Sequence, residues 1–239
     1  AVMTGFVGWW GQGQLSIVTV IGVIRTAWEG GSYAFLLYDP FSLLVWGAAI
    51  LGFVLWGRAL FCGWLCPFGA MQEFAHHVGR LLRLPEVTVP ARWDTRLKRL
   101  KYLVLAGLVA LIFVAPGALD TAVEVEPFKT AIILKFARPL PYVLIAIAFL
   151  LPGLFIERFY CRYVCPLGGG LAIPARLHMF RWLKRYKECG NPCQLCATDC
   201  PVKAIHPTGE INPNECISCL NCQVLYQDHD RCPRVPRQR

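Results

Sequence analysis

The most prominent feature of the chain is a series of long apolar stretches separated by shorter polar ones. Residues 41–60, 102–119 and 140–156 are each largely apolar. At about 1.5 Å per residue, each stretch is long enough to cross a hydrocarbon layer of about 30 Å as a helix. Residues 6–28 are also apolar and are expected either to span or to break near residues 11–13. The pattern predicts four transmembrane helices.

The positions of the basic residues predict an orientation for these helices. The chain has 24 Lys and Arg against 15 Asp and Glu, a formal charge of +9, and the excess lies before residue 188. Basic residues concentrate in residues 80–101 and 158–187, whereas the connections at 25–40 and 120–138 hold few. The positive-inside rule places the first two regions in the cytoplasm. We therefore expect a multi-pass protein of the bacterial cytoplasmic (inner) membrane, with both ends of the chain on the cytoplasmic side.

Composition narrows the class of protein further. The chain is 56% hydrophobic and only 16% charged, with 12 cysteines. A water-facing surface normally needs about a quarter of its residues charged, so a disordered tail and an ordinary soluble enzyme are excluded. Nucleic-acid binding is disfavoured because the basic excess belongs to the apolar part of the chain. Dinucleotide, phosphate-loop and Ser/His/Asp patterns are missing, so no catalytic residue is predicted.

A short motif occurs twice in the chain at an offset of 99 residues. It reads FCGWLCPFG at residues 61–69 and YCRYVCPLG at residues 160–168. Each copy follows an apolar stretch, which indicates two helical hairpins with the same ending. On a helix, the C-x3-C spacing places two sulfurs on one face, about 6 Å apart, and the following proline ends or bends the helix.

The repeat predicts that four cysteines converge if the hairpins pack as pseudo-symmetric partners: Cys62, Cys66, Cys161 and Cys165. Four thiolates suit a soft metal, such as Cu(I) or Zn(II), or an iron–sulfur cluster. A reversible dithiol/disulfide relay is one alternative, and buried cysteines acting as small hydrophobic residues are another. The spacing alone leaves these alternatives open.

The end of the chain, residues 188–239, carries the other eight cysteines in two runs that each resemble a ferredoxin run. In bacterial two-cluster ferredoxins, three cysteines of one run and one of the other hold each [4Fe–4S] cluster. This pattern assigns the first cluster to Cys189, Cys193, Cys196 and Cys232, and the second to Cys216, Cys219, Cys222 and Cys200. Zinc knuckles are the alternative, and disulfides are disfavoured in a reducing cytoplasm.

These observations together predict a mostly α-helical protein of two domains. Residues 1–187 are expected to form a four-helix transmembrane segment in which two hairpins end in C-x3-C-P motifs. Residues 188–239 are expected to form a small α+β ferredoxin-like domain with two [4Fe–4S] clusters. A segment this short and poor in apolar residues needs bound metal to offset the chain entropy lost on folding.

The combination of paired C-x3-C-P motifs with a two-run ferredoxin tail resembles the NosR/NapH family of membrane polyferredoxins. The residues that carry the resemblance are GQGQLS at 11–16, CGWLCPFG at 62–69, EPFKT at 126–130 and HPTGEINPNEC at 206–216. Within the family, the likeness is greatest to the C-terminal half of the NosR members, which belong to the nitrous oxide reductase system. Relatives of the family include the FixG/RdxA-type proteins of oxidase assembly.

The resemblance implies electron transfer toward periplasmic nitrous oxide reductase, for its activity or for maturation of its copper site. Quinol or a cytoplasmic flavoprotein would be the donor. A NapH-like role would instead imply quinol-linked supply to periplasmic nitrate reductase, and a FixG/RdxA-like role would imply copper reduction or trafficking. NosR members carry an upstream domain with covalently bound FMN; the sequence opens on Ala1 without that domain, so we expect it to be the membrane and ferredoxin part of a longer protein.

Overall fold

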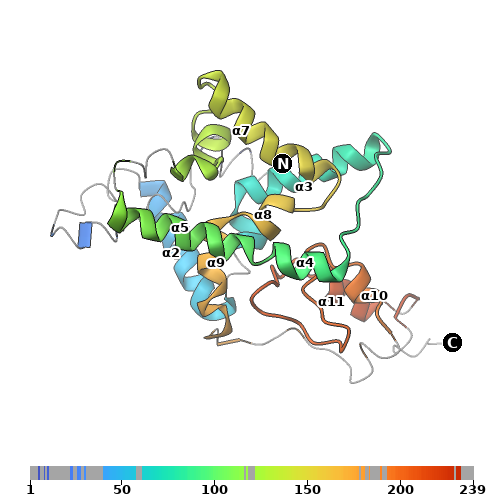
Figure 1. Ribbon diagram of the computed structural model, residues 1–239. Helices are drawn as coiled ribbons and strands as arrows, with labels where there is room; N and C mark the ends of the chain where they lie inside the picture. Colours follow the sequence, from blue (N-terminus) through green and yellow to red (C-terminus); the bar gives the residue numbers. More distant parts are fainter. Residues whose placement is uncertain are drawn as a thin grey trace.

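The structure is a computed structural model in which the elements are helices joined by loops (Figure 1). It describes residues 40–57, 61–115, 117, 122–177, 179–180, 183, 189, 193–228 and 230–232, together with residues 5, 8, 10, 22–23, 26–27 and 30. Most of the predicted span over residues 6–28 lies outside the described residues.

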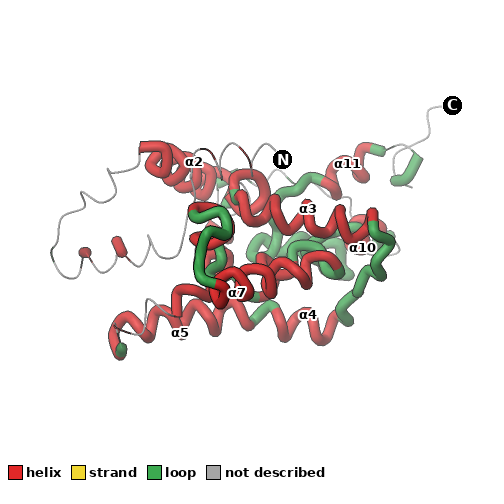
Figure 2. Tube along the Cα trace, turned by 90° about the horizontal axis from the view of Figure 1, so that it is seen from above, coloured by secondary structure: helices red, strands yellow, loops and turns green. Residues whose placement is uncertain are grey.

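The longer helices come from the apolar stretches and from the segment after the first C-x3-C-P motif. The α-helices are α2 Pro40–Trp56, α3 Pro67–Leu81, α4 Ala91–Leu97, α5 Leu100–Val114, α7 Leu140–Leu150, α8 Phe159–Tyr163, α9 Pro166–Ala172, α10 Leu195–Thr198 and α11 Asn221–Gln227. Shorter π-helical and 3-10 elements are η3 Phe61–Leu65, η4 Val123–Val125, η5 Lys129–Ile133, η6 Leu151–Leu154 and η7 Pro174–Leu177. Helix α5 packs along α9, and α3 packs against α7 and η6 (Figures 1 and 2).

The prediction of a four-helix transmembrane segment is wrong for the described residues, among which no helix has both the length and the apolarity of a membrane span. The three apolar stretches do form helices, but α2 has 17 residues, α5 has 15 and α7 has 11. A straight span needs about 20 residues. Local breakers end two of them. Gly57, which follows α2, adopts a left-handed φ of 74°, as is common just after a helix, and Pro152 lies in the 3-10 turn that follows α7.

The prediction of an α+β tail is also wrong over the tail residues that the structure describes, where no strand forms. The pairing there is limited to isolated bridges, antiparallel between Ile205 and Ile211 and parallel between Cys189 and Cys193. Two short helices, α10 and α11, pack against each other and supply the regular structure. The tail is therefore made of turns and short helices, which is a geometry that metal ligands can hold together.

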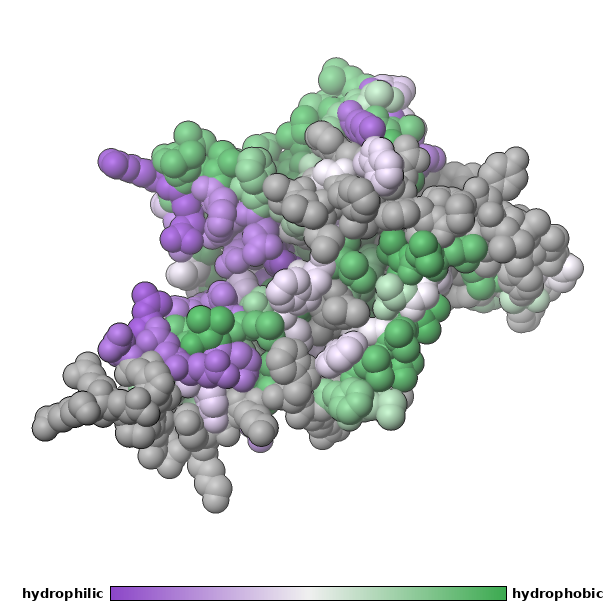
Figure 3. Space-filling view, turned by 180° about the vertical axis from the view of Figure 1, so that it is seen from behind, coloured by the Kyte–Doolittle hydropathy of each residue, from purple (hydrophilic) through white to green (hydrophobic). Residues whose placement is uncertain are grey.

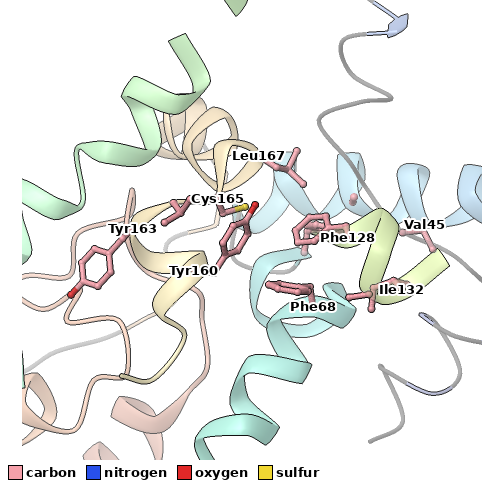
Figure 4. Packing of buried hydrophobic residues seen from close by; sticks show 12 residues of the cluster. Val45, Phe68, Phe128, Ile132, Tyr160, Tyr163, Cys165 and Leu167 are labelled. Atoms are coloured by element: carbon pink, nitrogen blue, oxygen red, sulfur yellow. The ribbon is translucent and has the colours of Figure 1, made fainter. Parts of the chain in front are cut away.

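The main core lies between the two copies of the repeated motif. Phe68 packs on Phe128 and Tyr160 with ring centroids 5.1 and 5.2 Å apart, and Phe149 lies 5.1 Å from Tyr160. Figure 4 shows Tyr160 turned toward Phe68 and Phe128, with Cys165 beside it. The Tyr160 hydroxyl donates to the carbonyl oxygen of Val125 at 3.1 Å, so the buried ring keeps a partner for its polar atom.

Much apolar surface stays outside this core. Figure 3 shows it over α7 and on the side away from the tail, while hydrophilic residues gather on the other side. The most exposed large apolar side chains of the long helices include Leu44, Leu51, Leu103, Phe113, Val114 and Leu140. The apolar stretches in the sequence therefore do not predict burial in this fold.

Candidate iron–sulfur sites

The two copies of the motif fold in the same way around their second cysteine. Cys66 and Cys165 are the N-caps of α3 and α9, and the following proline is the first residue of each helix. The Cys66 sulfur accepts the backbone N–H of Gly69 at 3.4 Å, and the Cys165 sulfur accepts that of Gly168 at 3.3 Å. The proline thus begins a helix, where its missing N–H costs nothing, instead of ending one as the sequence predicted.

Two buried polar side chains tie the copies to each other. Gln72 of α3 accepts a hydrogen bond from the backbone N–H of Cys161 at 3.4 Å. In the other direction, Arg158 donates to the carbonyl oxygen of Cys62 at 2.9 Å and pairs with Glu73 at 2.9 Å. Each motif is therefore held by a residue that belongs to the other half of the repeat, and sequence inspection gave no indication of these contacts.

The structure brings the four cysteines of the repeat together, as the sequence predicted. They line one cavity, which we call the four-cysteine cavity; its walls are Cys62, Cys66, Cys161, Cys165, Phe61, Phe128, Arg162, Leu167, Gly168, Val202, Glu215 and Ile217. Burial, together with the charge of neighbouring cysteines, raises the pKa of both Cys66 and Cys165. The hydrogen bonds from Gly69 and Gly168 lower these pKa values, but by less. A thiol with a raised pKa keeps its proton unless a bound cation takes the place of that proton.

The four thiols of this cavity are a ligand type that iron–sulfur clusters and soft metal ions share. Among the residues that the structure describes, no three His, Cys, Asp or Glu side chains are grouped so that they could hold one metal ion. A cluster binds each thiolate at a different iron, so its ligands lie farther apart than those of one Cu(I) or Zn(II) ion. The two motifs bring four cysteine side chains to one cavity.

Buried charges surround the four-cysteine cavity, and the sequence analysis missed them. Lys101 of α5 is fully buried and donates to both carboxylate oxygens of Glu215 at 2.7 and 2.8 Å. Arg162 pairs with Asp94 at 2.5 Å. Although burial opposes ionisation of Asp94, hydrogen bonds from Lys98 and Tyr163 and the charge of Arg162 hold its pKa below the ordinary value. The signal in the sequence was slight: Arg162 lies inside the motif, and Glu215 directly precedes a predicted ligand.

A second cavity contains the four cysteines assigned to the second tail cluster. This tail cavity is lined by Cys200, Cys216, Cys219, Cys222, Leu183, Pro201, Val202, Ala204, Ile205, Ile211, Ile217, Ser218, Leu220 and Asn221. Backbone N–H groups point at the sulfurs, from Ala204 to Cys200 at 3.3 Å and from Ser218 to Cys216 at 3.4 Å. Burial raises the pKa of Cys219 to about 11. Hydrogen bonds to the sulfurs are one of the features that set the potentials of iron–sulfur clusters.

The contacts of the described residues link only some of the cysteines assigned to the first tail cluster. Cys189 pairs with Cys193 in a bridge, and the Cys196 thiol contacts the carbonyl oxygen of Cys222 at 3.8 Å. Cys232 follows α11, and its backbone N–H donates to the backbone carbonyl oxygen of Asp228 at 2.9 Å. The grouping of Cys189, Cys193, Cys196 and Cys232 stays a prediction from the spacing.

The tail lies directly against the first copy of the motif. Val202 and Ile217 line both cavities, so one layer of side chains separates the two spaces. The indole N–H of Trp64 donates to the carbonyl oxygen of Ser218 at 3.1 Å. A Cβ atom on Gly63 would overlap the carbonyl oxygen of Ile217, so only glycine lets the backbones approach this closely.

We expect Gly63→Ala to destabilise the protein by about 1–3 kcal/mol, because the added methyl group must push the segment around Ile217 away. The matched control is Gly107→Ala in α5, where a Cβ would meet nothing within 4 Å. That change is expected to stabilise by about 0.5–1 kcal/mol through helix propensity. Chemical denaturation followed by circular dichroism measures both. Equal stabilities of the two variants would contradict the close approach.

Comparison with known proteins gives the class of protein that these sites define. A family model described as a 4Fe-4S binding domain matches residues 38–85 and 139–185, the two segments that contain the C-x3-C-P motifs. A family model described as NosR matches residues 187–239. The chain is thus an iron–sulfur protein of the ferredoxin type.

The particular family follows from its relatives. Protein NirI of Paracoccus denitrificans strain Pd 1222 is 48% identical over 231 residues, which cover 97% of this chain and 34% of NirI. Regulatory protein NosR of Pseudomonas aeruginosa strain PAO1 is 47% identical over 234 residues, which cover 98% of this chain and 33% of that protein. A shorter Regulatory protein NosR from Pseudomonas aeruginosa is 58% identical over 79 residues, 33% of this chain and 79% of its own length.

The chain belongs to the NosR family. It spans about one-third of the length of NirI and of the longer NosR. No solved structure matches it. The resemblance to this family that the motifs indicated is therefore confirmed.

Proposed function

We propose that this chain is the electron-transfer part of a NosR-family protein and that it delivers electrons toward nitrous oxide reductase, for activity or for maturation of its copper site. Quinol or a flavoprotein is the proposed donor. The observation that carries the proposal is the position of the two cysteine-lined cavities, which share Val202 and Ile217 as a common wall. A single wall of side chains suits one-electron exchange between groups held on its two sides.

The proposed ligands are those of the repeat and of the tail. Cys200, Cys216, Cys219 and Cys222 would hold one [4Fe–4S] cluster, and Cys189, Cys193, Cys196 and Cys232 would hold another. Cys62, Cys66, Cys161 and Cys165 would hold an iron–sulfur cluster between the repeats, which the match of both motif segments to a 4Fe-4S binding domain supports. When bound, such clusters supply one-electron couples. The protein residues exclude water, supply the thiolates and fix the distance between the sites.

The test is metal analysis of the anaerobically purified chain combined with a double variant, Cys66→Ser with Cys165→Ser. Serine is a good N-cap, so both helices should still begin at the same residue. We expect about twelve irons per chain in the natural protein and about eight in the variant, with loss of one reducible signal in low-temperature EPR. Circular dichroism checks that the fold is kept.

Three outcomes of this experiment are informative. An unchanged iron content in the double variant would contradict a cluster between the repeats. About four irons or fewer in the natural chain would contradict two clusters in the tail. If instead the double variant loses Cu(I) binding while it keeps its iron and its electron transfer, the copper-handling alternative is right. Cells that carry the double variant in the whole protein are then assayed for nitrous oxide consumption. This assay tests whether the electrons go toward nitrous oxide reductase.

A further inference from the structure

The two copies of the motif differ at the residue after their first cysteine, which is Gly63 in the first copy and Arg162 in the second. In the first copy, the tail occupies the space that a side chain would need, because the carbonyl oxygen of Ile217 lies against Gly63. In the second copy, a large cation occupies the equivalent place. The pseudo-symmetry of the repeat is therefore broken beside the four-cysteine cavity.

Arg162 is held firmly in this place. It lies in α8, is only 6% exposed and lines the four-cysteine cavity. One of its terminal nitrogens pairs with Asp94 at 2.5 Å. Asp94 is fixed in turn by the Tyr163 hydroxyl at 2.7 Å and by Lys98 at 2.9 Å. Three donors on one carboxylate fix the orientation of the guanidinium.

One polar atom of Arg162 takes no part in these ion pairs and hydrogen bonds. Its Nε is buried and has no hydrogen-bond partner. Such orphaned donors are rare in native proteins and usually mark a missing ligand, ion or water. Because Arg162 lines the four-cysteine cavity, an occupant of that cavity could supply the missing acceptor.

Arg162 is one of the buried charged groups around the cavity. These are three cations and three carboxylates, so their formal charges balance: Arg158, Arg162, Lys101, Asp94, Glu126 and Glu215. Among the described residues, Arg162 is the cation that lines the cavity itself. A [4Fe–4S] cluster bound by four thiolates carries two negative charges when oxidised and three when reduced, so a cation in the wall attracts the reduced state more strongly.

We infer that Arg162 tunes the potential of the cofactor in the four-cysteine cavity, by directing its Nε–H and its positive charge at that cofactor. This inference rests on the proposed iron–sulfur site between the repeats. A cation near the cluster stabilises the reduced form, with its extra negative charge, more than the oxidised form. Arg162 therefore raises the reduction potential of the cofactor. The cofactor gains one electron in this step, and no bond or proton changes.

The test is a redox titration of the EPR signal that the Cys66→Ser, Cys165→Ser double variant lacks. In Arg162→Gln, the reduction equilibrium of that signal is expected to shift about tenfold toward the oxidised form, which is about 59 mV for one electron. Arg162→Lys keeps the charge but not the planar N–H, so its potential should fall less. The matched control is Arg138→Gln, a half-buried arginine paired with Glu124 outside the cavity, which should leave the potential unchanged.

The outcomes separate this inference from the proposal on which it rests. If the natural chain has no signal that depends on Cys66 and Cys165, the proposed site itself is wrong. If the signal exists and Arg162→Gln titrates at the natural potential with full iron content, only the role of Arg162 is overturned. Should Arg162→Gln fail to hold iron, Arg162→Lys decides: a lowered potential supports the inference, and an unchanged one overturns it.

Discussion

Lys101→Met is expected to lower the free energy of unfolding by about 3–5 kcal/mol, because it leaves the carboxylate of Glu215 buried without its cation. Lys101 is 0% exposed, and the Glu215 side chain is 9% exposed. Removing one partner of such a pair costs far more than the pair contributes, since the remaining charge stays desolvated. Anaerobic denaturation in guanidinium followed by circular dichroism measures the loss.

The control for this prediction is a double variant that removes both charges, Lys101→Met with Glu215→Gln. Replacing both partners of a buried pair by neutral groups is often close to neutral, so much of the lost stability should return. Lys129→Met, at an exposed lysine of η5, should change the stability by less than about 0.5 kcal/mol. A loss below about 1 kcal/mol in Lys101→Met would contradict the burial of the pair.

Cys219→Ser is expected to remove about four irons from the chain and to unfold most of the tail. Cys219 lines the tail cavity with three other cysteines, and the buried apolar core of the tail is small, consisting of Val202, Ala204 and Ile217. Because so small a core cannot offset the chain entropy by itself, the metal has to supply the remaining stability. Iron analysis and limited proteolysis measure the two effects.

The matched control for the cysteine variant is Val224→Ser in α11, because Val224 is 67% exposed and lies outside the tail cavity. It should keep its iron and its resistance to protease. Full iron content in Cys219→Ser would show that this residue is not a ligand and would remove the crosswise assignment for the second tail cluster.

The grouping of the motif cysteines agrees with the structure better than the predicted helix lengths do. The offset of 99 residues between the motifs correctly grouped Cys62 with Cys66, Cys161 and Cys165, because a repeated supersecondary unit tends to pack on its own copy. The apolar stretches correctly located α2, α5 and α7. Their lengths were wrong, because the hydropathy of a stretch does not reveal where Gly57 or Pro152 ends the helix.

The charged residues around the sites were beyond prediction from the sequence. Lys101 stands at the start of an apolar stretch and looks like a residue of a solvated loop, but it is fully buried against Glu215, 114 residues away in the chain. Arg162 looks like part of the basic excess, but it pairs with Asp94 beside the four-cysteine cavity. The environment of each of these side chains comes from residues that are distant from it in the sequence.

The cysteine spacing predicts which residues supply thiolates and how they divide between the repeat and the tail, and the motifs correctly indicated the family to which the chain belongs. Cysteine spacing carries that information because ligands to one cluster must be close in space and are often close in sequence. The tertiary structure decided that the two cavities share a wall, that glycine is required at residue 63 and that Arg162 lies beside the four cysteines. Those features arise from backbone approach and from the pairing of buried charges, which depend on how distant segments pack.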